Sequence, residues 1–353
     1  MTQSTKPSGG MQRPVMDPTF VDLTQPKKRR LKIWHWIVNA ILKTARWFGR
    51  SLMSNPLAVR RPDEPRPSII KVVVRMAISW AIFLPALTAL LAAGFVAVGT
   101  HPAPPAVLLD PNCQGCYFDS ISFSGQDGTS LSGWMVPAID ARRVINEREK
   151  ILRSHRPGIV LVHDYGQSPQ QMLSLVKPLH DEGFNVLVVA LRGSVSARAT
   201  GETFGLKEAG DVSAAIDVLR HTPFVDGSRL AVAGIGSGAN AAMIAAAKDP
   251  SIKALIVANP LKNCDEAISN RVAPHDPWLS WMEPVCRHAF ELMYGVNADD
   301  LNYDRCSHVL KSRPSLIFDT GDAYAFANRT NVQQIRDFCR ANLHPQEALG
   351  SAR

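Results

Sequence analysis

The stretch RLAVAGIGSGANAAM, at residues 229–243, determines the fold expected for this chain of 353 residues. A short apolar run begins at Leu230, three glycines alternate at positions 234, 236 and 238, and an alanine-rich segment follows. The apolar run predicts a strand and the alanines predict a helix. A chain that turns from a buried strand into a helix needs left-handed dihedrals and close backbone approach, which glycine tolerates best. The stretch therefore predicts a strand, a tight turn and a helix.

The segments around this turn alternate between apolar strands and amphipathic helices. Two strands, FDSISFSGQ and SLSGWMVPA, are joined by Asp127 and Gly128, which is a hairpin signal. Further strands are expected at 158–163, 184–191, 253–258 and 314–318, with helices at 169–182, 206–220 and 328–340. Val- and Ile-rich runs that alternate with helices predict an α/β fold, with a mostly parallel sheet covered on both faces after an antiparallel start. Residues 259–313 are expected to be a helical cap insertion.

Charge divides the chain into two parts. The formal net charge is +8, but residues 1–75 hold 15 Lys and Arg against 4 Asp and Glu, and residues 76–353 hold 24 against 27. All the excess base therefore lies before residue 76, where it adjoins a long apolar run.

Residues 76–100, MAISWAIFLPALTALLAAGFVAVGT, carry no charge. At about 1.5 Å per residue, a helix of this length exceeds the roughly 30 Å hydrocarbon core of a bilayer. The run therefore predicts a single-pass transmembrane helix, and Pro85 is compatible with one. A cleaved signal peptide is the competing interpretation, but its apolar core is shorter and lies near the N-terminus. Basic residues gather before the run at positions 60, 61, 66, 71 and 75. The positive-inside rule then predicts a cytoplasmic N-terminus and an extracytoplasmic C-terminal domain.

The basic N-terminal part predicts two further segments. Residues 1–30 are expected to form a disordered tail that ends in KKRR. In residues 31–53, aromatic and aliphatic side chains recur at helical spacing opposite a basic face. This pattern is typical of an amphipathic helix in a membrane interface, although a helix packed on a protein partner has the same pattern. The lipid bilayer is thus the expected partner of residues 31–53 and 76–100, and nucleic acid is not expected as one.

The six cysteines all follow the apolar run. They are Cys113, Cys116, Cys264, Cys286, Cys306 and Cys339. An even number on one side of a membrane segment favours disulfides, while six reduced, buried thiols are the alternative. A pair at 113 and 116, and a bridge from the insertion to Cys339 that clamps the cap, are the candidate disulfides. No second C-x-x-C is present, so a metal site is not expected.

Several stretches together resemble the α/β-hydrolase superfamily, particularly its membrane-anchored serine hydrolases of the aminopeptidase and esterase type. They are VLVHDYGQS at 160–168, residues 190–220, GIGSG at 234–238 and PSLIFDTGD at 314–322. The resemblance implies an oxyanion loop with His163, Asp164 and Tyr165. It also implies a nucleophile elbow, G-x-S-x-G, in which a strained turn exposes the nucleophile. The elbow region then comprises Gly234, Gly236 and Gly238.

This sequence departs from the family's pattern at its chemistry. Gly236 stands at the nucleophile position, and Ser237 lies one place too late. Asp164 stands where the family has Gly, and Ala190 where it has Asp. Asp322 is near the expected position of the triad acid. The triad His normally follows one more strand, whereas here only His344 follows the last helix, and we expect that final strand to be missing.

The leading hypothesis is a membrane-anchored, catalytically degenerate hydrolase-like protein that binds an unknown small-molecule or protein ligand, or acts as a scaffold. The alternative is an active serine hydrolase, acting on an ester, thioester or amide, with Ser237, Asp322 and His344 as an unusual triad. Simpler roles are a helix N-cap for Ser237, a structural role for His163, and solvated helix positions for Asp211 and Asp217. No cofactor is expected.

The expected organisation follows from these segments. It comprises a tail at 1–30, the amphipathic helix and Pro-rich linker at 31–67, the transmembrane helix at 68–100, a Pro-rich stalk at 101–116, the hydrolase-like domain at 117–345 and a tail at 346–353.

Overall fold

The structure is a computed structural model that describes residues 68–138 except 104, residues 155–343 except 195–199 and 274–275, and the two positions Asn39 and Lys43. The tail expected at 1–30, the linker up to residue 67 and the amphipathic helix at 31–53, those two positions apart, lie outside the described residues. Residues 344–353, with His344, lie outside them as well.

A seven-stranded sheet forms the centre of the domain, in the order β1-β2-β4-β3-β5-β6-β7. Its strands are β1 (Asp119–Ser124), β2 (Ser130–Val136), β3 (Arg156–Val162), β4 (Asn185–Ala190), β5 (Val225–Ile235), β6 (Ile252–Ala258) and β7 (Ser315–Phe318). The hairpin β1–β2 is antiparallel and joins β4 antiparallel, and every pairing from β4 to β7 is parallel. The mostly parallel sheet expected from the sequence is thus confirmed, with its antiparallel start.

Burial explains the strand sequences. The central strands β3 to β6 are buried on both faces along most of their length, so they are continuous runs of Val, Ile, Leu and Ala. The edge strand β1 instead leaves alternate side chains exposed. Its hairpin turn closes where Gly125 N–H donates to Thr129 O at 2.8 Å, and Gly128 adopts a φ of +80°.

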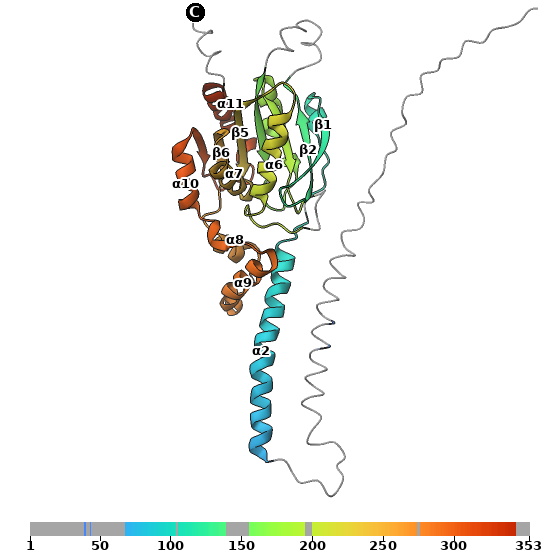
Figure 1. Cartoon of the computed structure of the whole chain (residues 1–353), viewed down its shortest axis with the longest axis vertical. Helices are drawn as coiled ribbons and strands as arrows, with labels where there is room; N and C mark the ends of the chain where they lie inside the picture. Colours follow the sequence, from blue (N-terminus) through green and yellow to red (C-terminus); the bar gives the residue numbers. More distant parts are fainter. Residues whose placement is uncertain are drawn as a thin grey trace, which may run out of the picture. The chain divides into compact units, whose positions relative to one another are not determined.

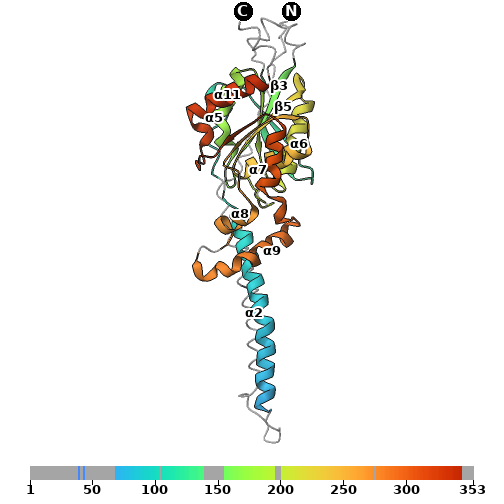
Figure 2. The same ribbon diagram turned by 90° about the vertical axis from the view of Figure 1, so that its left-hand side faces the viewer.

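Helices cover both faces of the sheet, as Figures 1 and 2 show. One face packs against α5 (Leu173–Asp181), which follows a short 3-10 turn, η2 (Pro169–Met172), and against α11 (Arg329–Leu343). The other face packs against α6 (Glu208–His221), α7 (Ser237–Lys248) and α10 (Tyr303–Ser312). Because α10 packs against α7, on the side of the sheet that α7 covers, the last part of the 259–313 insertion does not belong to the cap.

The cap consists of the earlier part of the insertion. It contains α8 (Cys264–Arg271), η3 (Pro277–Met282), α9 (Glu283–Tyr294) and η4 (Ala298–Asp300). These elements enclose a third apolar cluster that includes Phe204, Phe290 and two residues, Ala92 and Val96, of the helix α2 (Ile69–Gly99). In Figures 1 and 2 the cap lies between the sheet and the part of that helix that extends away from the domain.

The helix α2 (Ile69–Gly99) begins seven residues before the uncharged run. Within the described part of the chain it is the one helix long and apolar enough to cross a membrane. No described side chain of α2 before Ala92 is buried, whereas Ala92 and Val96 are fully buried. The helix therefore has a long exposed portion and a short docked end.

The cysteines correct the disulfide prediction. All six are among the described residues and all six are unpaired. Cys339 packs on the α5–α11 face of the sheet, Cys306 packs against the opposite face, and Cys264 and Cys286 lie in the cap cluster. A bridge from the insertion to Cys339 is therefore not formed, since different cores separate the thiols.

The pair at 113 and 116 is not bonded either. It lies on the 3-10 turn η1 (Pro111–Gln114) and just after it, and Cys113 is exposed while Cys116 is buried against the sheet. Burial raises the pKa of Cys116, and it raises the pKa of Cys264 to about 12. These buried thiols serve as small apolar side chains.

Candidate active site

The turn between β5 and α7 has the backbone geometry of an elbow. Gly236 is the N-cap of α7, with φ +56° and ψ −121°. L-residues with a side chain rarely adopt such dihedrals, and their strain costs of the order of 1–3 kcal/mol. Gly236 N–H donates to Ala258 O at 2.8 Å, which ties the turn to the end of β6. The strand, turn and helix predicted from residues 229–243 are therefore all present.

The two flanking glycines allow close packing. A Cβ on Gly234 would lie 2.4 Å from Gly238 O, and one on Gly238 would lie 2.3 Å from His163 O. Any side chain at either position would push the start of α7 away from β5 or β3. The glycine pattern thus keeps the elbow pressed against the sheet.

The carboxylate of Asp164 fills the space above Gly236. A Cβ on Gly236 would lie 2.0 Å from Asp164 Oδ1 and 2.5 Å from Oδ2. Asp164 comes from the loop that follows β3. The place that a nucleophile's side chain would take in a G-x-S-x-G elbow therefore holds the carboxylate of another residue.

The same carboxylate takes the backbone donors of the site. Ser237 N–H donates to Asp164 Oδ1 at 2.8 Å, and Tyr165 N–H donates to the same oxygen at 2.7 Å. In α/β-hydrolases the oxyanion hole is made by the N–H of the residue after the nucleophile and by an N–H of the loop after the third strand. Ser237 follows Gly236 in the chain and Tyr165 lies on the loop after β3, which are the positions where the family's pattern would put these two donors. The positive end of the α7 dipole also favours an anion here.

Ser237 is the first residue of α7 and is 2% exposed. The N-cap is Gly236, so the N-cap role expected for Ser237 is wrong. No hydrogen bond joins its Oγ to another described residue, and its main-chain N–H is capped by Asp164. The sequence predicted Ser237 as the N-cap because a local pattern does not show that the distant Asp164 binds the Ser237 N–H.

Both ring nitrogens of His163 are engaged. Nε2 accepts from Leu191 N–H at 3.2 Å, and Nδ1 lies 2.8 Å from Asp164 O, to which it donates in the matching tautomer. The ring is fully buried, and burial lowers its pKa, which favours neutral imidazole. These contacts give His163 the structural role that was expected as the simpler one.

Asp322 belongs to an exposed turn after β7. Its Oδ1 accepts from Tyr324 N–H at 2.8 Å, and its carbonyl accepts from the side chain of Asn259 at 2.7 Å. None of the described contacts joins Asp322 to Ser237 or to His163. The third residue of the alternative triad, His344, is outside the described residues, so no triad is assembled from the described part of the chain.

The docked end of α2 closes over this loop. The Tyr165 hydroxyl donates to Gly99 O, and Gly201 N–H donates to His101 Nε2 at 3.2 Å. A Cβ on Gly166 would lie 3.2 Å from Pro102. The residues that follow Asp164 are thus covered by the last turn of α2 and by the residues after it.

The cap adds a positive charge beside Asp164. Arg271, the last residue of α8, places Nη2 3.9 Å from Asp164 Oδ2. Its guanidinium carbon lies 4.6 Å from the centre of the Tyr165 ring, a cation–π contact. The negative charge held in the elbow is therefore balanced from the cap.

A second acid, Glu202, is buried near the same loop. It is 4% exposed and accepts from Gly166 N–H at 3.1 Å. Burial raises its pKa well above the usual value, and the nearby charge of Glu208 adds to this shift. Glu208 itself accepts from the N–H groups of Thr203 and Gly205. The region thus holds several acidic side chains that accept hydrogen bonds from main-chain donors.

Residues 190–220, one of the stretches that resemble the family, contain a buried ion pair. Arg192 donates to Asp211 from Nε at 2.9 Å and from Nη2 at 2.5 Å, and from Nη1 to Asp127 at 2.7 Å. Asp211 is fully buried, so its expected role as a solvated residue is wrong, whereas Asp217 is half exposed and pairs with Arg220. Although burial opposes its charge, these hydrogen bonds raise the pKa of Arg192. The pair fastens α6 and the hairpin turn to the end of β4.

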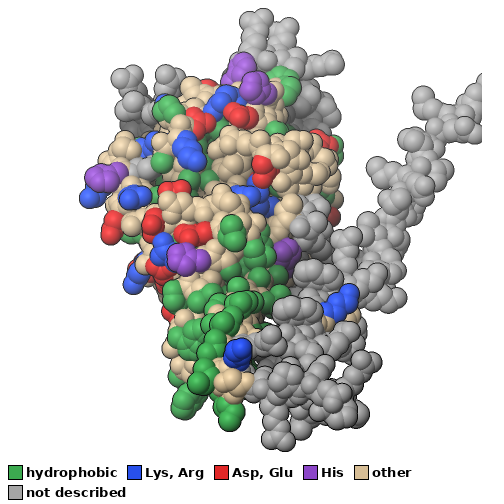
Figure 3. All heavy atoms as spheres, turned by 60° about the horizontal axis from the view of Figure 1, so that its bottom comes forward, with side chains coloured by type: hydrophobic (Ala, Val, Ile, Leu, Met, Phe, Trp, Pro, Cys, Tyr) green, Lys and Arg blue, Asp and Glu red, His purple; other side chains and the backbone are tan. Residues whose placement is uncertain are grey.

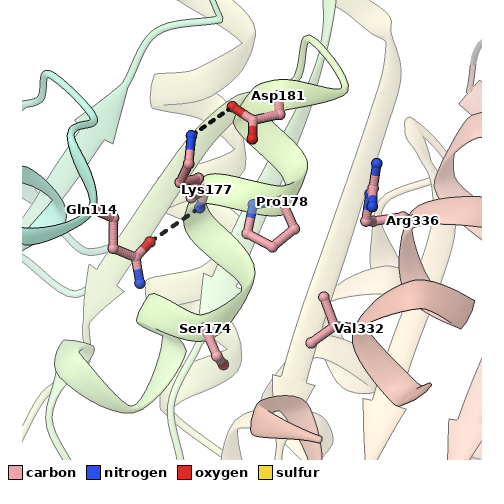
Figure 4. A pocket seen from close by; sticks show the side chains of 7 residues that line it. All are labelled: Gln114, Ser174, Lys177, Pro178, Asp181, Val332 and Arg336. Carbon is pink, nitrogen blue, oxygen red and sulfur yellow. Dashed lines mark hydrogen bonds and ion pairs between the residues drawn. The ribbon is translucent and has the colours of Figure 1, made fainter. Parts of the chain in front are cut away.

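A surface cavity of about 510 Å³ lies elsewhere on the domain. Ser174, Lys177, Pro178 and Asp181 of α5 line it together with Val332 and Arg336 of α11 and with Gln114, as Figure 4 shows. Lys177 pairs with Asp181 at 3.1 Å, and Arg336 donates to Glu182 at 3.0 Å from Nε. The cavity does not border the elbow, and its charged groups have protein partners. Among the described residues, no His, Cys, Asp and Glu side chains form a group that could hold a metal ion.

The sequence interpretation missed three contributions to this site. They are the placement of Asp164 over Gly236, the counter-charge of Arg271, and closure by the end of α2. One signal for the first was present. The pattern exchanges Gly for Asp at 164 and the nucleophile for Gly at 236, so a side chain is gained near the position where one is lost.

No protein-family model matches the chain. The uncharacterized protein YfhR of Escherichia coli O157:H7 is 28% identical over 164 residues, 46% of this chain and 53% of YfhR. YfhR of E. coli K12 is 30% identical over 121 residues, 34% of this chain and 38% of that protein. The matched part of the chain thus spans about half or less of the length of these curated relatives.

Among solved structures, the esterase Pf2001 of Pyrococcus furiosus matches with a TM-score of 0.50 and 16% identity, over 69% of this chain and 98% of that one. At this identity the likeness concerns the fold alone. The chain therefore has an α/β-hydrolase-like fold.

Proposed function

We propose that this chain is a membrane-anchored, extracytoplasmic protein whose hydrolase-like domain is catalytically silent and acts by binding a small molecule or a protein, or as a scaffold. One observation carries the proposal. The Asp164 carboxylate lies where the nucleophile's side chain would be. It also accepts hydrogen bonds from the two N–H groups, of Ser237 and Tyr165, that would form an oxyanion hole.

The chemistry explains why this arrangement opposes hydrolysis. Acyl transfer needs a nucleophile, a base that takes its proton, and donors kept for the oxyanion that develops in the transition state. Gly236 supplies no nucleophile, and both nitrogens of His163 are engaged in structural contacts. An oxyanion would also have to displace a carboxylate from its donors, against the repulsion of two like charges.

Ester hydrolysis tests this proposal. The full-length protein, purified in detergent, should hydrolyse p-nitrophenyl acetate and butyrate no faster than its Ser237→Ala variant. Asp322→Asn serves as the matched control for the second residue of the alternative triad. A rate in the wild type that falls by two or more orders of magnitude in Ser237→Ala would support the active serine hydrolase instead.

Anchoring by α2 is the second part of the proposal. The helix is apolar, and its described side chains before Ala92 are not buried by the protein, so a bilayer is the environment that would cover them. The basic residues that precede residue 76 favour a cytoplasmic N-terminus. The unpaired cysteines no longer support an oxidising compartment, so orientation rests on the charges alone.

Reporter fusions test the orientation. Alkaline phosphatase fused after Arg353 should be active in a bacterial host, and β-galactosidase fused at the same place should be inactive. The reverse pair of activities would place the domain in the cytoplasm. A fusion of each reporter before Met1 should give the opposite pattern and serves as the control.

A further inference from the structure

We infer that the cap is seated in the outer interface of the same bilayer that α2 crosses, through an exposed apolar surface that we call the cap patch. The cap patch consists of Trp278 and Trp281 on η3 and Leu292 and Met293 on α9. This inference rests on the proposed membrane span, but it assigns a second contact with lipid to a different part of the chain.

The length of α2 sets the depth of the cap. Lys71 and Arg75 precede the uncharged run that begins at Met76. At about 1.5 Å per residue, the roughly 30 Å hydrocarbon core takes about 20 residues, so a span from Met76 reaches Phe95. The docked portion of α2 begins at Ala92, before that point. The cap elements around this portion are therefore at the depth where the core meets the headgroups.

The cap is held firmly at that depth. Ala92 and Val96 are buried in one cluster with Met282 and Phe290 of the cap. At the end of α9, the hydroxyl of Tyr294 lies 2.6 Å from Thr100 Oγ1. Because α9 packs on α2, and η3 packs on α9, the cap patch cannot withdraw from the membrane without breaking an apolar core.

The cap patch has the composition of an interfacial surface. Trp278 and Leu292 are each 86% exposed, Trp281 is 54% exposed and Met293 is 46% exposed. Tryptophan is enriched where a membrane meets water, because its ring is apolar and its N–H can reach headgroups and water. Figure 3 looks at this end of the molecule and shows that hydrophobic side chains gather there.

The charged groups of α9 are compatible with this placement. Arg287 pairs with Asp265 at 2.8 Å and with Asp299 at 2.5 Å, and it lies 3.6 Å from Glu291. Arg287 offsets one of these three negative charges, and the exposed His288 lies 3.2 Å from Glu291. Headgroup depth accommodates such groups, whereas the hydrocarbon centre does not.

Photo-crosslinking with lipid tests the inference. The full-length protein is reconstituted in phosphatidylcholine vesicles that contain a phosphatidylcholine with a diazirine near the start of its acyl chain. After irradiation, peptides are mapped by mass spectrometry. We expect adducts on η3 and on the end of α9 as well as on α2. Tyr117, which is 66% exposed and precedes the strand β1 at the far end of the sheet, is the control and should carry none.

The outcomes separate this inference from the proposed anchor. Adducts on α2 with none on the cap would overturn the inference and leave the span intact. An unlabelled α2 would overturn both. Labelling of the Tyr117 peptide to the same extent as the cap peptides would also overturn it, because the cap would then be no closer to lipid than the opposite end. In a Trp278→Gln, Trp281→Gln, Leu292→Gln variant, cap adducts should fall at least fivefold while α2 adducts persist.

Discussion

Two acidic residues of the domain, Asp211 and Asp164, illustrate what the fold retains and what its elbow has exchanged. Asp211 is fully buried and meets the guanidinium of Arg192 with both of its oxygens. Asp164 has no such partner, since Arg271 approaches only to 3.9 Å, and it binds main-chain donors of the elbow instead. The first carboxylate supports packing. The second occupies donors that an active hydrolase keeps for its transition state.

The Arg192 pair should give the largest effect. Replacing Arg192 by Met leaves Asp211 buried without its cation, and breaking a buried pair in this way costs about 3–5 kcal/mol. Urea unfolding of the full-length protein in detergent should show this loss. Asp217→Asn, at a half-exposed position on the same helix, is the control and should change stability by no more than about 0.5 kcal/mol. Equal stability of the two variants would contradict the role given to Arg192.

A side chain at the elbow should give the next effect. In Gly236→Ser the new Cβ would collide with Asp164 Oδ1, and the residue would keep a φ of +56°. We expect a loss of about 1–3 kcal/mol from overpacking and strain. Adding Asp164→Gly removes the collision, so the double variant should be more stable than the sum of the two single changes implies. Strict additivity in the unfolding free energies would show that Asp164 does not lie over Gly236.

The contacts that these variants disturb also show which parts of the structure could be predicted from the sequence. Strands and helices were predictable because the periodicity of residues such as Ala209, Val212, Ile216 and Leu219 is local. The pairing of Asp164 with Gly236, and of Arg192 with Asp211, brings together residues distant in the chain, and single-sequence patterns do not encode such contacts. The prediction that Asp211 is solvated was wrong for this reason, and so was the predicted bridge from the insertion to Cys339, whose thiols lie in separate apolar cores.

Glu202 should give the smallest effect, as a change with pH. Its raised pKa means that the folded protein holds a proton which the unfolded chain releases at lower pH. Stability should therefore fall as pH rises from about 4.3, the ordinary glutamate value, toward the raised pKa. Glu202→Gln removes this titrating group, so the free energy of unfolding should fall less between pH 5 and 8 in the variant. If unfolding free energies of wild type and variant keep a constant difference over that range, Glu202 does not titrate as described.

The central claim is that the elbow holds a carboxylate where a nucleophile would be, and covalent labelling tests it most directly. The full-length protein in detergent is incubated with a fluorophosphonate probe, with an active serine hydrolase in the same sample as control, and its intact mass is measured. We predict that the control gains the mass of the probe and that this chain does not. Stoichiometric labelling of the chain, abolished by Ser237→Ala, would contradict the account.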